Sequence, residues 1–375
     1  MELSIPHSPR ILGPAENPAI ARARELVLSY GWNSTAFQIV NPGIRRWFSA
    51  EGDAVVGFVP AGGFRVVAGA PVCSAERLPQ VASEFEAAAR NEGEEVCYFC
   101  AESRLESNQA AMKSHAKFLI GAQPSWRPAN WKSIVRGHRS LRAQLNRARN
   151  KGVTVTEWPE SRARSNPSLI KCLHEWLETK GLPPLHFMVE PETLSRLEYR
   201  RTFVAEREGE VVGFVVLSPV AQRNGWLFEQ FPHVPSAPNG TVELMIDTAM
   251  DAIAADGSDY ATLGLSPLSR RISVEGLDNP FWLRLLLAWL RKHGKRFYNF
   301  DGLDAFKAKL QPETWEPVFA VCSEPRVRPR TIYAIAVAFS ANAPIRMVAG
   351  GLWKAAAAEF RHARRSLISI RSNGR

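Results

Sequence analysis

Cysteine is scarce in this chain, with five residues among 375, at positions 73, 97, 100, 172 and 322. Few, scattered and odd in number, they do not form the framework of a secreted disulfide protein and fit a reducing cytosol. Cys97 and Cys100 have CxxC spacing, but they lie in the apolar stretch 96–101, and neither a second such pair nor a histidine cluster would complete a zinc site. We therefore expect buried core cysteines, no metal site and a cytoplasmic protein.

Long hydrophobic runs are also missing. No uninterrupted apolar stretch reaches the roughly 18 residues of a transmembrane helix, and the first residues lack the basic and apolar regions of a signal peptide. The run 281–290 is short and contains Arg284, so we interpret it as a core helix. Residues 331–353 are interrupted by polar residues and predict an interfacial or packed helix. The basic stretch from Arg361 completes a tail, 323–375, that either contacts anionic lipid or is a disordered, solubilising segment.

Acidic residues are outnumbered, with 37 Asp and Glu against 47 Lys and Arg and a formal net charge of +10. Such an excess favours polyanionic partners: nucleic acid, an anionic membrane surface or a phosphorylated substrate. The length exceeds what one hydrophobic core supports, so two folded domains are expected.

Two halves of the chain repeat one pattern of three strands, a helix and a further strand. The first half, after a helix at 19–30, has strands 44–50, 54–60, 64–70 and 95–101 around a helix at 75–91. The second has strands 202–208, 211–220, 225–231 and 260–265 around a helix at 242–255, followed by a helix at 280–293 and a strand at 297–301. This duplicated unit has the layout of a GNAT acyltransferase domain. The glycine-rich fingerprint that binds acetyl-CoA is missing from both halves, so the cofactor is not expected to be CoA.

We therefore predict an α/β (α+β) fold of two tandem GNAT-like domains, residues 1–131 and 153–322, joined by a basic helix within 132–152. Residues 132–151 contain seven Lys or Arg and no acidic residue, and Gly137 interrupts the pattern, which places the helix proper at 140–150. Solvated helices normally interleave acids with bases. An anion-binding helix is favoured over a solvated connector, with these candidate tRNA contacts: Arg139, Arg142, Arg147, Arg149 and Lys151.

Four segments of the second half share one resemblance. They are Pro238-Asn239-Gly240 before a helix, 262–269 (TLGLSPLS), 300–312 (FDGLDAFKAKLQP) and Trp315-Glu316-Pro317. Together they resemble the catalytic domain of bacterial phosphatidylglycerol lysyltransferases, the multiple peptide resistance factor family, over roughly 30–319. The basic linker is similar to that family's Arg-rich linker.

The resemblance implies an aminoacyltransferase. Aminoacyl-tRNA would be the co-substrate, with no other cofactor, and the glycerol hydroxyl of phosphatidylglycerol would be esterified, usually with lysine or alanine. The tail described above, 323–375, would then make the peripheral contact with anionic phospholipid at the inner face of the cell membrane. The chain is similar to the stand-alone form that lacks the family's large N-terminal membrane domain.

Candidate site residues follow from the motifs. Glu229 stands where the family has an acidic residue, and it would bind the ammonium of the aminoacyl group or act as base; the family's Arg falls on Pro232. His233 is either a proton carrier or structural. Lys307 is predicted to contact an anion, unless it is a surface lysine. The candidate substrate-binding residues are Lys309, Asn239, Gly240, Asp301 and Gly264.

Two of these candidates open a helix. Asn239 and Gly240 would offer free N–H groups to an anion or oxyanion, or simply cap the helix. A tRNA ester is already reactive, so alignment and oxyanion stabilisation suffice without a Ser-His-Asp triad. Two alternatives stay open: a CoA-dependent N-acyltransferase, and a non-catalytic relative that binds RNA or membranes.

Overall fold

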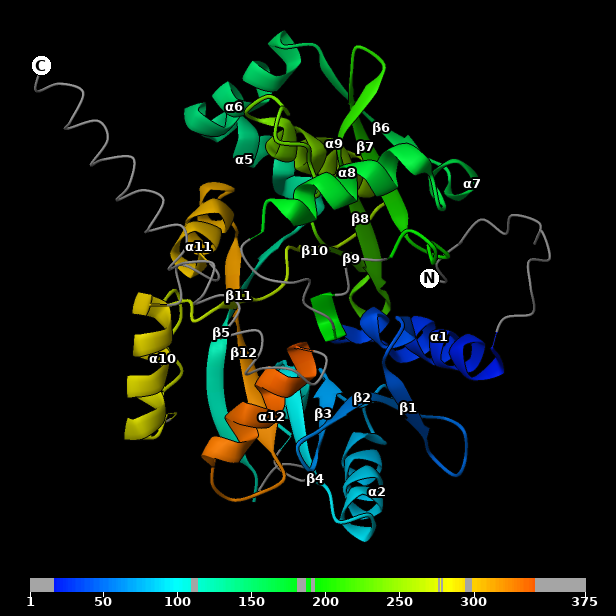
Figure 1. The fold of residues 1–375 in the computed structure, drawn as a ribbon, viewed down its shortest axis with the longest axis vertical. Coiled ribbons are helices and arrows are strands. Elements are labelled where there is room, and N and C mark those ends of the chain that lie inside the picture. Colours follow the sequence, from blue (N-terminus) through cyan, green and yellow to red (C-terminus); the bar gives the residue numbers. More distant parts are fainter. Residues whose placement is uncertain are drawn as a thin grey trace, which may run out of the picture.

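The structure of the chain is a computed structural model, which describes residues 17–108, 114–180, 187–189, 193–275, 277, 279–293 and 299–340. Its centre is a mixed twelve-stranded sheet with the strand order β1-β2-β3-β4-β12-β5-β10-β9-β8-β7-β6, and β11 pairs with β5 beside this path. Helices cover both faces of the sheet (Figure 1).

The first repeat occupies one end of the sheet. Strands β1 (Arg45–Phe48), β2 (Val55–Ala61) and β3 (Phe64–Ala68) form an antiparallel meander, and α2 (Leu78–Asn91) leads to β4 (Glu95–Ala101), which runs parallel to β3. α2 packs its apolar side on one sheet face through Val81 and Phe85. α1 (Pro18–Tyr30), the short helix η1 (Ala36–Val40) and α12 (Pro329–Phe339) cover the other face. The predicted strand and helix order of this half is confirmed.

The second repeat builds the other end. Strands β6 (Val153–Trp158), β7 (Arg201–Arg207), β8 (Glu210–Val220) and β9 (Gly225–Phe228) are antiparallel, and α9 (Thr241–Ala255) leads to β10 (Tyr260–Thr262), parallel to β9. α9 packs on one face and α8 (Pro167–Glu178) on the other. Each half thus contains one parallel pair connected through a helix, as the duplicated GNAT-like fold requires.

Two long strands join the halves. β5 (Ala116–Trp126) leaves the first half and pairs with β10 of the second, whereas β12 (Thr314–Cys322) leaves the second half and inserts between β4 and β5. Each half therefore gives a strand to a shared sheet centre (Figure 1). The predicted domain boundaries stay a prediction.

The basic linker folds as two helices, α5 (Trp131–Gly137) and α6 (Arg139–Asn150), separated at His138. α6 buries Leu141, Leu145 and Ala148 against α9. The predicted break near Gly137 and the predicted packed face are confirmed.

Two expectations are wrong. The strand expected at 297–301 is not found in its described part, 299–301, because Phe300 and Asp301 begin helix α11 (Phe300–Lys309), whose N-cap Asn299 accepts a hydrogen bond from the Gly302 N–H. Residues 297 and 298 lie outside the described residues. α10 (Phe281–His293) forms as a helix but is no core helix, since Phe281, Leu285 and Trp289 remain 69%, 56% and 59% exposed.

The remaining outcomes concern cysteines and the tail. All five cysteines are buried and free, in agreement with the expectation. α12 is a packed helix, while the rest of the tail, from 341, including the stretch after Arg361, lies outside the described residues. In the part of the chain that the structure describes, no helix is long and apolar enough to cross a bilayer.

Candidate active site

The sheet of the second half opens where its parallel pair ends. β9 and β10 run together only as far as Leu227 beside Thr262. Beyond this point, the segment from Glu229 stays with β8, as shown by the bond from the Glu229 N–H to the Val216 carbonyl (3.0 Å). The chain after Thr262 turns instead toward β5, with which Ser266 pairs through β11 (Ser266–Pro267). The two arms frame the candidate site.

Glu229 is the acidic group at this opening, and its side chain is only 8% exposed. Its Oε1 atom accepts hydrogen bonds from Arg200 Nε (3.2 Å), Gln38 Nε2 (3.3 Å) and the Ser218 hydroxyl. Ser218 comes from β8, Arg200 from the residue before β7, and Gln38 from η1 of the first half. Three donors on one oxygen fix the orientation of this carboxyl group. Whether it binds the ammonium of the aminoacyl group or acts as base, the two predicted roles, stays a prediction.

Arg200 anchors this cluster between the halves. Its guanidinium donates to Asn41 Oδ1 (2.7 Å) and lies 4.9 Å from the centre of the Phe37 ring. Asn41 in turn donates to Gln38 Oε1 (2.6 Å). The second half thus supplies the carboxylate, while the first half supplies part of the cradle that orients it.

Lys307 closes the other arm of the opening. Its ammonium donates to the carbonyls of Leu263, Gly264 and Leu265, each at 2.8 Å. Burial lowers the pKa of Lys307 to about 7. Main-chain carbonyls accept all three hydrogens of the ammonium, so Lys307 holds the loop after β10. The sequence predicted a contact with an anion, and the structure does not place Lys307 in that way. Gly264, whose φ is +67°, is part of the loop that it holds.

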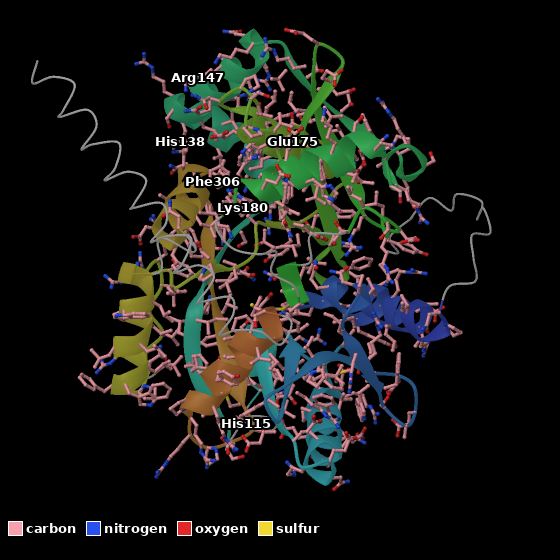
Figure 2. All side chains as sticks on the ribbon, viewed as in Figure 1. His115, His138, Arg147, Glu175, Lys180 and Phe306 are labelled. Atoms are coloured by element: carbon pink, nitrogen blue, oxygen red, sulfur yellow. The ribbon has the colours of Figure 1, made fainter. Side chains whose placement is uncertain are left out.

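The other polar residues of α11 point to different neighbours. Asp301 pairs with Arg291 of α10 (2.8 Å). Lys309, on the opposite side of α11 from Lys307, pairs with Glu243 in the first turn of α9 (2.7 Å). Neither is an unoccupied substrate contact, and both fix α11 against its neighbours. Phe306, labelled in Figure 2, lies on α11. Its ring approaches that of Phe231 edge-on at 6.3 Å between ring centres, which connects α11 to the arm that carries Glu229.

The start of α9 is built for close packing. Gly240 is its N-cap with φ +96°, and a Cβ there would lie 2.2 Å from the Gln144 carbonyl oxygen of α6. No side chain caps this helix, and Asn239 is exposed. The Pro-Asn-Gly motif therefore permits contact between α9 and α6. Of the two predicted roles, the motif does supply the N-cap residue, Gly240, although without a side-chain hydrogen bond from Asn239. Anion binding stays a prediction.

His233 lies away from the carboxylate of Glu229. His233 forms a β-bridge with Gly213 on β8, whereas Glu229 pairs with Val216. Gly213 and Val216 are three residues apart, which is roughly 10 Å along the strand. The Nδ1 atom of His233 is 2.8 Å from the Phe231 carbonyl oxygen. These contacts are those of a structural histidine, one of its two predicted roles.

The predicted tRNA contacts divide into two groups. Arg139, Arg147 and Lys151 are exposed on α6 and its end, and Figure 2 places Arg147 on the outside of this helix. Arg142 instead donates to the Val135 carbonyl (3.3 Å), and Arg149 pairs with Asp247 of α9 (2.7 Å). The expected outward position is found for Arg149, whose side chain is half exposed beside this ion pair, but not for Arg142, which turns toward α5. Whether these residues contact tRNA stays a prediction.

The sequence did not reveal the residues that position the site: Gln38, Asn41, Arg200, Ser218 and Asp304. Asp304 is buried and accepts hydrogen bonds from Ser269 (2.6 Å) and Arg271 (2.9 Å). Asp304 lies inside the 300–312 motif and Ser269 ends the 262–269 motif, so a search for partners between motifs would find this pair. Gln38 and Arg200 lie in no motif and are separated by more than 160 residues.

A second polar cluster lies at the opposite ends of β9 and β10. Arg223 binds both oxygens of Glu316 (2.9 and 2.5 Å), reaches Glu102 (3.2 Å) and stacks 3.5 Å from the centre of the Tyr260 ring. Burial raises the pKa of Glu102. Burial acts in the same direction on Glu316, but hydrogen bonds from Arg223 outweigh it and lower the pKa of that carboxyl. The cluster fastens β12 to both halves.

Comparisons with known proteins agree with this architecture. The family model for the C-terminal region of phosphatidylglycerol lysyltransferase matches residues 24–322. A phosphatidylglycerol lysyltransferase of Bacillus subtilis strain 168 is 24% identical over 274 residues, which are 72% of this chain and 31% of that protein. The chain thus spans about a third of the length of this curated relative.

Two solved structures carry the same fold. The C-terminal domain of a putative lysylphosphatidylglycerol synthetase from Agrobacterium fabrum superposes with a TM-score of 0.72 at 22% identity, over 86% of this chain and 98% of that one. L-PGS from Bacillus licheniformis gives 0.71 at 21% identity, over 88% and 98%. With a family model matched over most of its length, the chain belongs to the family of phosphatidylglycerol lysyltransferase C-terminal domains.

Proposed function

We propose that this protein transfers an amino acid from aminoacyl-tRNA to the glycerol hydroxyl of phosphatidylglycerol or a closely similar membrane lipid. The observation that carries the proposal is membership of the lysyltransferase family over residues 24–322, together with a buried carboxylate at the opening between β9 and β10. Aminoacyl-tRNA is the co-substrate, with no other cofactor, and the protein works as a cytoplasmic, peripheral enzyme at the inner face of the membrane.

Glu229 is the group that we assign to the amino-acid end of the substrate. Its Oε1 atom is held by Arg200, Gln38 and Ser218, so the second oxygen is the one positioned to receive the α-ammonium of the aminoacyl group. This contact would align the ester carbonyl with the incoming lipid hydroxyl. Such alignment is the main requirement of the reaction, because the tRNA ester is already reactive.

Lys307 acts as a positioning residue in this proposal. By holding the carbonyls of 263–265, it fixes the direction of the loop that forms the opposite wall of the opening. At the centre of this loop, the Gly264 N–H donates to Thr262 Oγ1 (3.0 Å) and the Gly264 carbonyl accepts from Lys307, so this wall of the opening is fixed at both main-chain groups.

The tRNA side is supported by the contacts of α6. α6 packs on the first turn of α9 at Gly240, and the same turn carries Glu243, which holds Lys309 of α11. The basic helix is therefore connected to the site helix through a single turn. We propose that a tRNA bound along Arg139, Arg147 and Lys151 presents its acylated end to the side of the molecule that carries α9 and α11.

Two alternatives remain distinct in their chemistry. A CoA-dependent N-acyltransferase would transfer acyl groups from CoA to an amine in the absence of tRNA. A non-catalytic relative would bind RNA or membranes and leave the aminoacyl ester intact. The feature that favours the non-catalytic alternative is Pro232, which stands where the family has an Arg.

The deciding experiment incubates the full-length protein with tRNA charged with each of several labelled amino acids and with vesicles of phosphatidylglycerol and phosphatidylcholine. We expect label in the organic phase with phosphatidylglycerol present and none with phosphatidylcholine alone. Label that remains on tRNA for every amino acid and lipid, or acyl transfer that requires CoA, would reject the proposal.

A further inference from the structure

The outward side of α10 is apolar and basic, and its large side chains are mostly exposed. Among the described residues, five large hydrophobic side chains are exposed, and three of them lie on this one helix: Phe281, Leu285 and Trp289. At about 100° per residue, they form one stripe of roughly 140° together with Arg284 and Ala288, which are also exposed. We call these five residues the α10 outer face.

The opposite side of α10 explains why the helix is held in this orientation. Leu283 is fully buried in the core of the first half, and Trp282, Leu286 and Leu287 pack against the same core. The helix is therefore fixed to the sheet through one side. Figure 1 shows α10 at the edge of the molecule.

The charge of this helix specifies its partner. Residues 280–293 contain Arg284, Arg291 and Lys292 and no acidic residue. The Arg284 guanidinium lies 6.0 Å from the centre of the Phe281 ring, so a positive charge sits within the apolar stripe. Aromatic and leucine side chains beside arginine are typical of helices that lie in the interface of an anionic bilayer. A 13-residue helix is too short to span one.

The position of α10 connects this face to the candidate site. Arg291, in its last turn, pairs with Asp301 in the first turn of α11 and donates to the Leu268 carbonyl (2.5 Å). Lys307 follows Asp301 by six residues, roughly 9 Å along α11. A bilayer on the α10 outer face would therefore lie close to the arm of the opening that Lys307 holds.

We propose that the α10 outer face is a membrane-docking surface that inserts Phe281, Leu285 and Trp289 among the headgroups of an anionic bilayer, with Arg284 at the phosphates. This inference rests on the proposed function, because it names the surface through which the lipid acceptor would reach the site.

The test is vesicle flotation of the full-length protein, without tRNA, on vesicles of phosphatidylglycerol and phosphatidylcholine. We expect the triple variant Phe281→Gln, Leu285→Gln, Trp289→Gln to bind roughly tenfold or more weakly than wild type. Arg284→Gln should weaken binding only when phosphatidylglycerol is present. The matched control is Tyr199→Asn, which removes an exposed aromatic from another surface at a residue with φ +62°, a conformation that Asn tolerates; it should bind as wild type.

Three results would overturn the docking proposal. They are a wild-type protein that does not float, a triple variant that floats as well as wild type, and a wild-type dimer that the triple variant dissociates without any change in flotation. The last would assign the face to a second copy of this chain. Equal thermal unfolding temperatures of the variants would show that these exposed substitutions leave the fold intact.

An activity measurement separates this inference from the proposed function. With a monomeric short-chain phosphatidylglycerol, the triple variant should transfer the amino acid as fast as wild type, while its transfer to vesicles falls. If neither protein aminoacylates any lipid, the proposed function fails, and flotation still decides whether α10 docks.

Discussion

The ammonium of Lys307 is buried, and no carboxylate of the residues that the structure describes forms an ion pair with it. Three main-chain carbonyls accept its hydrogens, and its nearest acid, Asp304, is already bound by Ser269 and Arg271. Charge solvated by carbonyl dipoles alone is costly in a protein interior. Lys307 is thus the residue at which the geometry of the candidate site is most sensitive to pH.

This burial predicts a measurable link between pH and stability. The folded protein loses the Lys307 proton near pH 7, whereas the unfolded chain keeps it to about 10.5. Between these values unfolding takes up a proton, so this lysine makes the free energy of unfolding rise with pH. We expect the free energy of unfolding of wild type minus that of Lys307→Met to rise by about 1 to 1.4 kcal/mol per pH unit. Urea unfolding of both proteins at pH 7.5 and 9 measures this difference. A difference that stays constant or shrinks would contradict the buried environment described for Lys307.

The elements around the site are locked to one another by single side chains. α11 is joined to α10 by Asp301, to α9 by Lys309 and to the Glu229 arm by Phe306. α6 is joined to α9 by the close approach at Gly240 and by the pair of Arg149 with Asp247. Binding at the basic helix and positioning of the site helix therefore share the first turns of α9.

The exposed bases of α6 predict a specific effect on tRNA affinity. The slope of log affinity against log salt is negative, and each phosphate contact that is lost reduces its magnitude by about 0.7 to 0.9. Arg139→Gln, Arg147→Gln and Lys151→Gln together should therefore reduce the slope by about 2 to 3, measured by filter binding between 50 and 200 mM salt.

A matched control for this variant removes the same charge elsewhere. Arg22, Arg90 and Arg328 have exposed side chains on or beside α1, α2 and α12. Their replacement by Gln should leave the slope within half a unit of wild type. Equal losses in both triple variants would mean that tRNA responds only to net charge and that α6 is not its docking surface.

The sequence predicted those helices and strands whose hydrophobic period or flanking glycines can be recognised locally. β4 forms at the expected residues, and α6 and α9 begin within one residue of their expected starts, because hydrophobic period and glycine breaks are local properties. β5 and β12 were missed. Each contains a proline inside the strand, Pro124 and Pro317, and they pair with each other across about 190 residues. Pairing at that distance leaves no local pattern, and proline argues against a central strand.

The candidate site was predicted in part for the same reason. Glu229, Gly264 and Lys307 were identified from motifs, and the structure brings these segments together at the opening between β9 and β10. The partners of Glu229 come from η1 and the start of β7, which only the folded sheet places beside it. The exposed stripe of α10 was read as core because an apolar helix sequence does not reveal which of its sides is covered.

At the scale of the whole molecule, the halves hold each other by exchanged strands and by buried charge. Arg223 joins Glu316 on β12 to Glu102 after β4, and its side chain is 16% exposed. Arg223→Met would leave the buried carboxylate of Glu102 and the partly buried carboxylate of Glu316 without their cation. We expect a loss of about 3 kcal/mol in the free energy of unfolding, measured by urea denaturation.

The control for this loss is an ion pair on the surface. Arg22 pairs with Glu25 at 3.1 Å with both side chains well exposed. Arg22→Met should cost less than about 1 kcal/mol. Similar costs for the two substitutions would show that the central cluster does not join the halves.

In the proposed reaction, an amino acid passes from tRNA to lipid at the opening between β9 and β10. This can be measured in a single-turnover assay of label passing from aminoacyl-tRNA to phosphatidylglycerol, with wild type, Glu229→Gln and the exposed-site control Glu157→Gln. We predict transfer by wild type and Glu157→Gln, and a loss of roughly a hundredfold or more in Glu229→Gln, as when an aligning or electrostatic contact is removed. Transfer by Glu229→Gln at the wild-type rate would contradict the account.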